Sequence, residues 1–158
     1  MLKVLLGCAI IAFFSFCGYF LSKKYRQRKM FFRQLYDFNQ RFLNEIAYYR
    51  RPIQEFAVKY AYQGEFEEVL HSFLASLNGG LLDLNDYTFL REDEKMFLSD
   101  YFQMLGKGDS ASQKAYYTSV KDGLVKWKIN SEQEAQKYED LYIKLGFLCG
   151  LFILIMII

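Results

Sequence analysis

Hydrophobic residues are concentrated at the two ends of the chain, and this distribution limits the possible folds more than any other feature. Residues 4–22 and 145–158 contain no charged side chain, whereas all 18 acidic residues lie between Asp37 and Asp140. A helix formed by the 19 residues of the first segment is about 28 Å long, close to the ~30 Å hydrocarbon core of a bilayer. The sequence therefore predicts a transmembrane helix at residues 4–22.

The apolar segment at 145–158 has 14 residues, a length that also fits a core helix or an interfacial segment. Residues 141–143 extend it, and the long side chain of Lys144 can reach the lipid headgroups while its stem stays among apolar groups. We therefore expect a second, C-terminal transmembrane segment at 145–158.

Two membrane spans place both termini on one side of the membrane. Six basic residues lie between Lys23 and Arg33, so the positive-inside rule predicts that the central domain is cytoplasmic and both termini are outside. A cleaved signal peptide or lipoprotein anchor at the N-terminus is the alternative, but no small-x-small cleavage site precedes Lys23. All three cysteines lie in the apolar ends, so no disulfide framework is expected in the central domain.

The central domain, residues 23–144, has a helical hydrophobic period almost throughout. The first stripe recurs at spacings of three and four residues and consists of Phe31, Leu35, Phe38, Phe42, Ile46 and Tyr49. One helix is therefore expected from Val4 to about Arg50, where Pro52 stops it. The predicted fold class is all-α: a cytoplasmic helical bundle carried on two long helices that continue into the N- and C-terminal transmembrane segments.

Shorter helices are predicted between these two. Pro52 opens one that ends at Gly64, a second carries the inward stripe Phe66 to Leu77, and a third runs from near Arg91 to Gly106. Ser110 and Gln113 are spaced as a capping box that opens the last helix, which we expect to continue unbroken into residues 145–158.

Catalytic and metal-binding chemistry has little support in the sequence. The single histidine, His71, is expected to be structural, since one imidazole cannot form a histidine cluster or a zincin-like helix, and a lone imidazole without partners is weak evidence for a pH switch or a ligand. The carboxylates at 65–68 and 92–94 are explained by the preference of helix first turns for negative charge. Gly106-Lys107-Gly108 follows a predicted helix and not a strand, unlike a phosphate-binding loop. No cofactor, metal site or enzymatic activity is predicted.

Charge is divided unevenly along the central domain. Residues 23–51 carry nine basic and two acidic residues, a sum of +7, whereas residues 52–144 carry ten basic and sixteen acidic ones, a sum of −6. Anionic lipids attract cations near a membrane surface. We therefore predict a lipid-facing basic collar and no nucleic-acid partner; the collar residues are Lys23, Lys24, Arg26, Arg28 and Lys29.

Several short motifs resemble those of the stage III sporulation protein AB family of endospore-forming bacteria. They are Gly7 and Gly18 in the first apolar segment, Glu45-Ile46-x-Tyr48 with Pro52 shortly after, Leu105-Gly106 followed by Asp109 and Gln113, and the ending Lys144-Leu145-Gly146-Phe147-Leu148-x-Gly150. The resemblance extends over residues 1–158, although residues 51–90 match only in pattern. An expected tryptophan is missing from the helix predicted at residues 66–77, and Lys107-Gly108 replaces a second Leu-Gly pair.

The resemblance implies a non-enzymatic platform in the mother-cell membrane facing the forespore, similar to the inner-membrane platform proteins of type II secretion and type IV pilus systems. Such a platform docks a secretion-type ATPase, here the companion stage III sporulation protein AA, together with other components of the sporulation channel. The motif residues implied as interaction candidates are Glu45, Tyr48, Pro52, Gly106, Asp109, Gln113, Gly146 and Gly150. A membrane-tethered lipid- or protein-binding adaptor is the alternative, a carboxylate-based membrane enzyme is less favoured, and homo-oligomerisation stays open.

Overall fold

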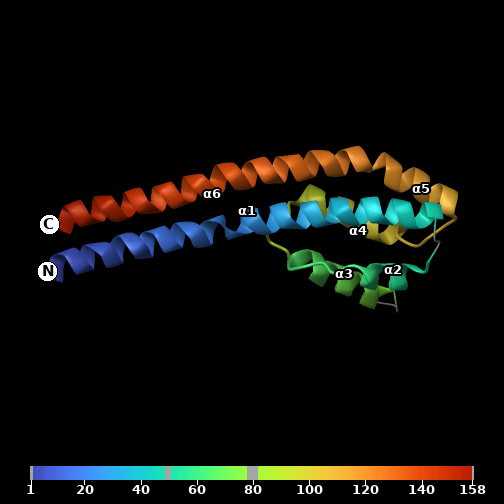
Figure 1. The fold of residues 1–158 in the computed structure, drawn as a ribbon, viewed down its shortest axis with the longest axis horizontal. Helices are drawn as coiled ribbons and strands as arrows, with labels where there is room; N and C mark the ends of the chain where they lie inside the picture. The colour runs from blue at the N-terminus through green and yellow to red at the C-terminus, as the bar shows by residue number, and fades with distance from the viewer. Residues whose placement is uncertain (1, 49–50, 78–81, 158) are drawn as a thin grey trace. The chain divides into compact units, whose positions relative to one another are not determined.

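The computed structural model describes residues 2–48, 51–77 and 82–157. Within these ranges the chain forms helices and no strand, which confirms the all-α prediction (Figure 1). The helices are α1 (Leu2–Tyr48), α2 (Ile53–Lys59), α3 (Glu65–Ser76), α4 (Glu92–Met104), α5 (Ser110–Ser119) and α6 (Lys121–Ile157).

The first helix follows the sequence prediction closely. α1 is continuous over 47 residues, and five members of its predicted stripe, Phe31 to Ile46, are buried. The sixth, Tyr49, and the predicted helix end at Arg50 lie outside the described residues. Pro52 precedes α2 as its N-cap, with φ −56°, because the ring of proline fits the start of a helix but not its interior.

The last helix differs from the prediction. The expected single helix is two helices, α5 and α6, separated at Val120. The backbone carbonyl of Tyr117, in the last turn of α5, accepts a hydrogen bond of 3.2 Å from the buried Asn39 side chain of α1. This contact ties the end of α5 to the core, which a sequence period cannot reveal.

The helix start near residue 110 is also shifted by one residue. Asp109, and not Ser110, is the N-cap of α5, and its side chain accepts a hydrogen bond from the Ser112 N–H. Gln113 donates to the Lys107 carbonyl at 2.9 Å instead of closing a capping box. The predicted box is therefore wrong, although a helix does begin at this point of the chain.

No helix in the described portion of the chain combines the length and the sustained hydropathy that a membrane span requires. The transmembrane helices expected at 4–22 and 145–158 therefore lack support from the structure. Both segments are nevertheless helical, as the first part of α1 and the last part of α6.

The chain divides into two compact units. The first, which we call the terminal hairpin, consists of Met1–Arg26 and Ser131–Ile158, and the second, the bundle, consists of Gln27–Asn130. In the terminal hairpin α1 and α6 are antiparallel, because residues 7, 11, 14 and 18 of α1 contact residues 154, 150, 146 and 142 of α6. In Figure 1 the two ends of the chain accordingly lie beside each other.

The bundle is built around aromatic side chains. Its core cluster contains the fully buried rings of Phe31, Phe32, Phe38, Phe56, Phe66, Tyr101, Phe102 and Tyr117. Two of the buried tyrosine hydroxyls in this core have hydrogen-bond partners. The Tyr101 hydroxyl donates to Asn39 Oδ1 at 3.0 Å, and the Tyr117 hydroxyl donates to the Tyr101 carbonyl at 2.9 Å. Burial raises the pKa of the Tyr101 hydroxyl well above its usual 10.0.

Candidate functional site

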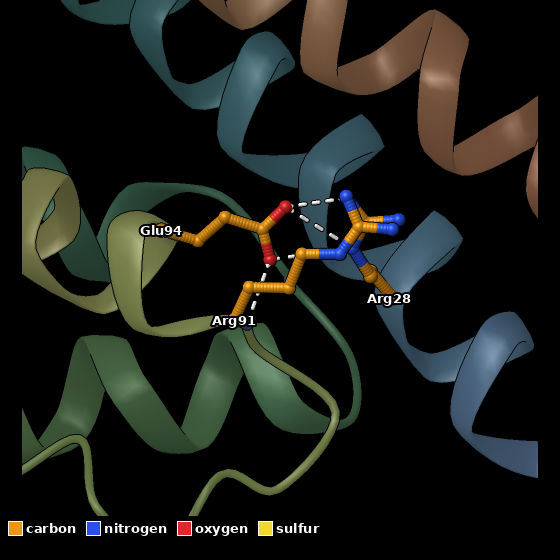
Figure 2. Close-up of polar contacts among 3 residues, drawn as sticks. All are labelled: Arg28, Arg91 and Glu94. Carbon is orange, nitrogen blue, oxygen red and sulfur yellow. Dashed lines mark hydrogen bonds and ion pairs between the residues drawn. The ribbon is translucent and has the colours of Figure 1, made fainter.

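A buried ion pair joins α1 to α4 inside the bundle (Figure 2). Arg28 Nε lies 3.1 Å and 3.2 Å from the two carboxylate oxygens of Glu94, and a terminal guanidinium nitrogen contacts the same group. The Arg91 N–H donates to Glu94 Oε2 at 3.0 Å. Glu94 therefore binds the guanidinium of α1 and at the same time accepts from the backbone at the start of its own helix.

The position of this pair corrects two sequence predictions. Arg28 is 4% exposed, so it is not part of a lipid-facing collar, and Glu94 is 1% exposed, so it is not a solvated residue of a helix first turn. The helical period contained a signal for Arg28. It lies four residues before Phe32 and seven before Leu35, both of which are buried, so it belongs to the inward face of α1.

The rest of the predicted collar is divided. Lys23 and Lys24 are exposed, and Lys29 is half-buried. Arg26, in the terminal hairpin, lies over the Tyr19 ring at 3.7 Å and forms an ion pair with Glu139 at 3.4 Å. Only part of the collar thus offers charge that is open to lipid.

Two of the predicted motif residues, Glu45 and Gln113, meet at one end of the bundle. A pocket of about 120 Å³ is lined there by Glu45, Arg51, Ile53, Gly108 and Gln113, with Phe42, Ile46 and Ser110 completing it. The Glu45 side chain is buried, and its two oxygens lie 3.4 Å from Arg51 Nε and 3.7 Å from Lys59 Nζ. Arg51 and Lys59 therefore lie beside the motif residue Glu45, although the motif itself includes neither of them.

The turn before α5 has specific backbone requirements. Gly106 has φ +78°, and a Cβ at this position would lie 3.2 Å from Ile53 Cγ2, so a larger residue would meet both backbone strain and a tight contact. Two hydrogen bonds from Ser112 lower the pKa of the Asp109 carboxyl. The hydroxyl of Ser112 has the larger effect and its backbone N–H the smaller one. Asp109, Gly106 and Gln113 therefore shape the end of the bundle.

Only Glu45 and Gln113 of the predicted site residues line this pocket; Gly106 and Asp109 lie in the turn beside it. Tyr48 is 78% exposed and Pro52 is also exposed; neither lines the pocket. Gly146 and Gly150 belong to the terminal hairpin. A Cβ on Gly146 would lie 2.4 Å from the Phe14 carbonyl oxygen, and one on Gly150 would lie 2.9 Å from Ile11 Cα. Both glycines permit close approach of α1 and α6.

The described residues contain no group of three or more His, Cys, Asp or Glu side chains that could hold a metal ion. His71 is not buried in the core as a structural histidine. It is exposed on α3, with Nε2 3.9 Å from Glu67 Oε1. The two buried carboxylates, Glu45 and Glu94, lie in ion pairs with arginine or lysine, an arrangement typical of structural carboxylates.

Together these features define an all-helical protein whose buried charges hold helices together. The sequence model of the family described as stage III sporulation protein AB matches residues 3–158. The chain therefore belongs to this family, which confirms the resemblance seen in its motifs. No curated protein and no solved structure shows a significant match to it.

Proposed function

We propose that this protein is a non-enzymatic membrane platform of the secretion-like channel between mother cell and forespore, and that its bundle docks the companion ATPase, stage III sporulation protein AA. The observation that carries this proposal is membership of the family over residues 3–158. The family points to a sporulation protein, and the platform role and its partners are the proposed step beyond that.

Membrane anchoring is supported by the side chains on the outside of the terminal hairpin. The large apolar groups point away from the helix contact and are between 47% and 75% exposed; they include Phe13, Phe16, Phe20, Phe147, Leu148, Phe152, Ile155 and Met156. A surface of this kind is unfavourable in water and favourable among lipid tails. We therefore propose that residues 4–22 and 145–158 anchor the protein in the membrane.

Aromatic and basic residues follow the first apolar segment and precede the second one within the hairpin. The Tyr25 ring stacks on Tyr138, with ring centres 4.6 Å apart, and lies 6.1 Å from the Tyr142 ring. Tyrosine is enriched where a bilayer meets water, and basic residues are enriched on the cytoplasmic side. These residues support a membrane boundary at this level of the hairpin, with the central domain in the cytoplasm and both termini outside. The mother-cell membrane is the proposed location because of the family.

Docking of the ATPase is tested with the full chain in detergent or in membranes. The purified companion ATPase should bind the wild-type protein reversibly in a pull-down and in a solution titration. The protein should also stay in the membrane fraction after alkaline carbonate extraction. Failure to bind the ATPase in both detergent and reconstituted vesicles would contradict the docking role, and release by carbonate would contradict the anchoring.

A second candidate is a membrane-tethered adaptor that binds lipid through Lys23 and Lys24, which are exposed beside the aromatic residues of the hairpin. This function predicts binding to anionic vesicles that weakens as salt rises, because exposed charges are screened beyond about 10 Å at 0.1 M salt. Replacing both lysines with glutamine would abolish that salt dependence and leave ATPase binding intact. Loss of ATPase binding in the same variant would argue against separate lipid and protein surfaces.

A further inference from the structure

The terminal hairpin has a defined register between α1 and α6. A Cβ on Gly18 would lie 3.5 Å from Ile143 Cα. A Cβ on Gly146 would lie 3.4 Å from Ser15 Cα. In this antiparallel pair, Lys144 is therefore level with the residues between Ser15 and Gly18. The charge at position 144 thus lies beside the apolar segment of α1 and not beyond its end.

This register makes the uncharged parts of the two helices unequal. Lys23 is the first charged residue after the apolar segment of α1, and it lies about 9 Å further along that helix than the level of Lys144. On α6, both Lys144 and Asp140, one turn earlier, are exposed. Charged side chains that face lipid tails are unfavourable. Hydrocarbon beside α6 is therefore expected to end close to Lys144.

The cations of α1 reach back toward the same level. Side chains of a helix tilt toward its N-terminus, and the N-terminal end of α1 is its apolar end. The Lys23 ammonium accordingly lies 6.0 Å from the centre of the Phe20 ring. The Arg26 guanidinium, which also pairs with Glu139, lies 3.7 Å from the centre of the Tyr19 ring. We call this the cation level of the hairpin; its members are Lys23, Arg26 and Lys144.

The part of the hairpin below the cation level is short for a membrane span. From Lys144 to Ile157, α6 measures about 20 Å. The hydrocarbon core of a typical bilayer is ~30 Å thick, so about 10 Å of it would meet charged or polar groups. The stacked rings of Tyr25 and Tyr138 lie on the bundle side of the cation level, where headgroups are expected and tyrosine is enriched.

We propose that the terminal hairpin is matched to a thin bilayer, with about 20 Å of hydrocarbon beside it. A span that is shorter than the surrounding hydrocarbon thins the bilayer locally or is sorted into membrane that is already thin. This inference rests on the proposed function, because it describes how the anchoring segments lie in lipid. The partner is the acyl-chain region of a phospholipid bilayer, which the hairpin selects by chain length and not by headgroup.

The test measures insertion of the full chain into phosphatidylcholine vesicles that differ only in acyl-chain length: dimyristoleoyl, dioleoyl and dierucoyl. The protein is synthesised cell-free in the presence of preformed vesicles, and inserted protein is the fraction that floats with them after alkaline carbonate treatment. We expect insertion to be highest with dimyristoleoyl chains and about tenfold lower with dierucoyl chains, because each ångström of mismatch costs free energy. The headgroup is constant, so electrostatic attraction does not differ between the three lipids.

Substitution of Lys144 tests whether this residue sets the matched thickness. Lys144→Leu lengthens the uncharged part of α6 and should reduce the preference for the short-chain lipid about threefold. Lys144→Arg keeps the charge and should retain the wild-type preference. Lys137→Leu is the matched control, because Lys137 is exposed on the same helix outside the uncharged segment, and it should not change the preference.

Thiol labelling measures the depth of the cation level directly. In variants whose native cysteines are replaced by serine, a membrane-impermeant maleimide should modify Phe20→Cys nearly as fast as Lys24→Cys. Phe13→Cys should react at least about tenfold more slowly, because it lies within the uncharged segment that lipid covers.

The outcomes separate this inference from the function on which it rests. Equal insertion into all three lipids, best insertion into dierucoyl vesicles, an unchanged preference in Lys144→Leu, or protection of Phe20→Cys as complete as that of Phe13→Cys would overturn the inference and leave the anchoring intact. Release of the wild type by carbonate from every lipid would contradict the anchoring itself.

Discussion

The terminal hairpin and the bundle are both made of helices, but they pack in opposite ways. In the hairpin, glycines face the partner helix and phenylalanines face outward. Phe16 and Phe152 are 64% and 65% exposed, and Gly18 and Gly146 are positioned against the opposite backbone. In the bundle, phenylalanines such as Phe32 and Phe38 are completely buried. Whether a phenylalanine is buried or exposed therefore depends on the unit to which it belongs, and not on the residue type alone.

This contrast indicates what stabilises each region. In lipid, helices associate through close backbone contact at small residues, because no hydrophobic effect drives them together. In water, the burial of aromatic rings itself stabilises the packed state. The contrast supports different surroundings for the two units, as the proposed function requires. Substitutions in each unit test whether this difference in packing holds.

The largest effect is expected in the bundle from Glu94→Gln. It replaces the carboxylate of a buried ion pair with a neutral amide, and removing one partner of such a pair costs about 3–5 kcal/mol. Chemical unfolding of the full chain in detergent, followed by circular dichroism, measures this loss. Glu92→Gln, on the same helix but at an exposed side chain, is the control and should change stability by less than about 0.5 kcal/mol. Similar values for the two variants would show that the pair is not structural.

Gly146→Leu should weaken the hairpin by about 1–3 kcal/mol, the usual cost of forcing extra atoms into a packed contact, because a Cβ at this site meets the Phe14 backbone. Cross-linking of Cys17 to Ile143→Cys, with Cys8 and Cys149 replaced by serine, reports hairpin closure, since Gly18 lies against Tyr142 and Ile143.

Gly123→Leu is the matched control for Gly146→Leu, because no atom lies within 4 Å of a Cβ at this position. It should leave the cross-link unchanged. A normal cross-link in Gly146→Leu would show that the glycines are not what holds α1 and α6 together.

Tyr101→Phe tests the polar centre of the bundle and should cost about 1–3 kcal/mol, because Asn39 Oδ1 loses its buried donor.

Wild-type stability should also fall as the pH rises above about 10. The unfolded chain then ionises its tyrosines, whereas burial raises the pKa of Tyr101 in the folded state, so the unfolded state releases more protons. The alkaline loss should be smaller in Tyr101→Phe. Equal alkaline losses in both proteins would contradict this account of the centre.

The smallest effect is expected from Asp109→Ala, which removes the N-cap of α5. Because hydrogen bonds lower the pKa of Asp109, its contribution is present above the usual carboxyl range and is lost as the pH falls through the lower, folded-state value. Amide hydrogen exchange at Ser112 should therefore be faster in the variant near neutral pH and equal to wild type in strong acid. Exchange at α6 residues is the internal control and should not change.

The sequence alone determined that the chain is helical, that α1 is long and ends before Pro52, and that Phe31 to Ile46 face a core. These features depend on periodicity and on proline, which act over a few neighbouring residues. The short motifs, which include Gly146 and Gly150, also identified the family.

Only the tertiary structure decided which charges are buried. Arg28 reads as one of several cations in a basic run, and Glu94 as one of three acids at a helix start, until α1 and α4 are brought together and remove both from water. The break at Val120 and the cations beside Glu45 were decided in the same way. The free energy of a charge or a carbonyl depends on partners that are distant in sequence, and a local pattern does not contain them.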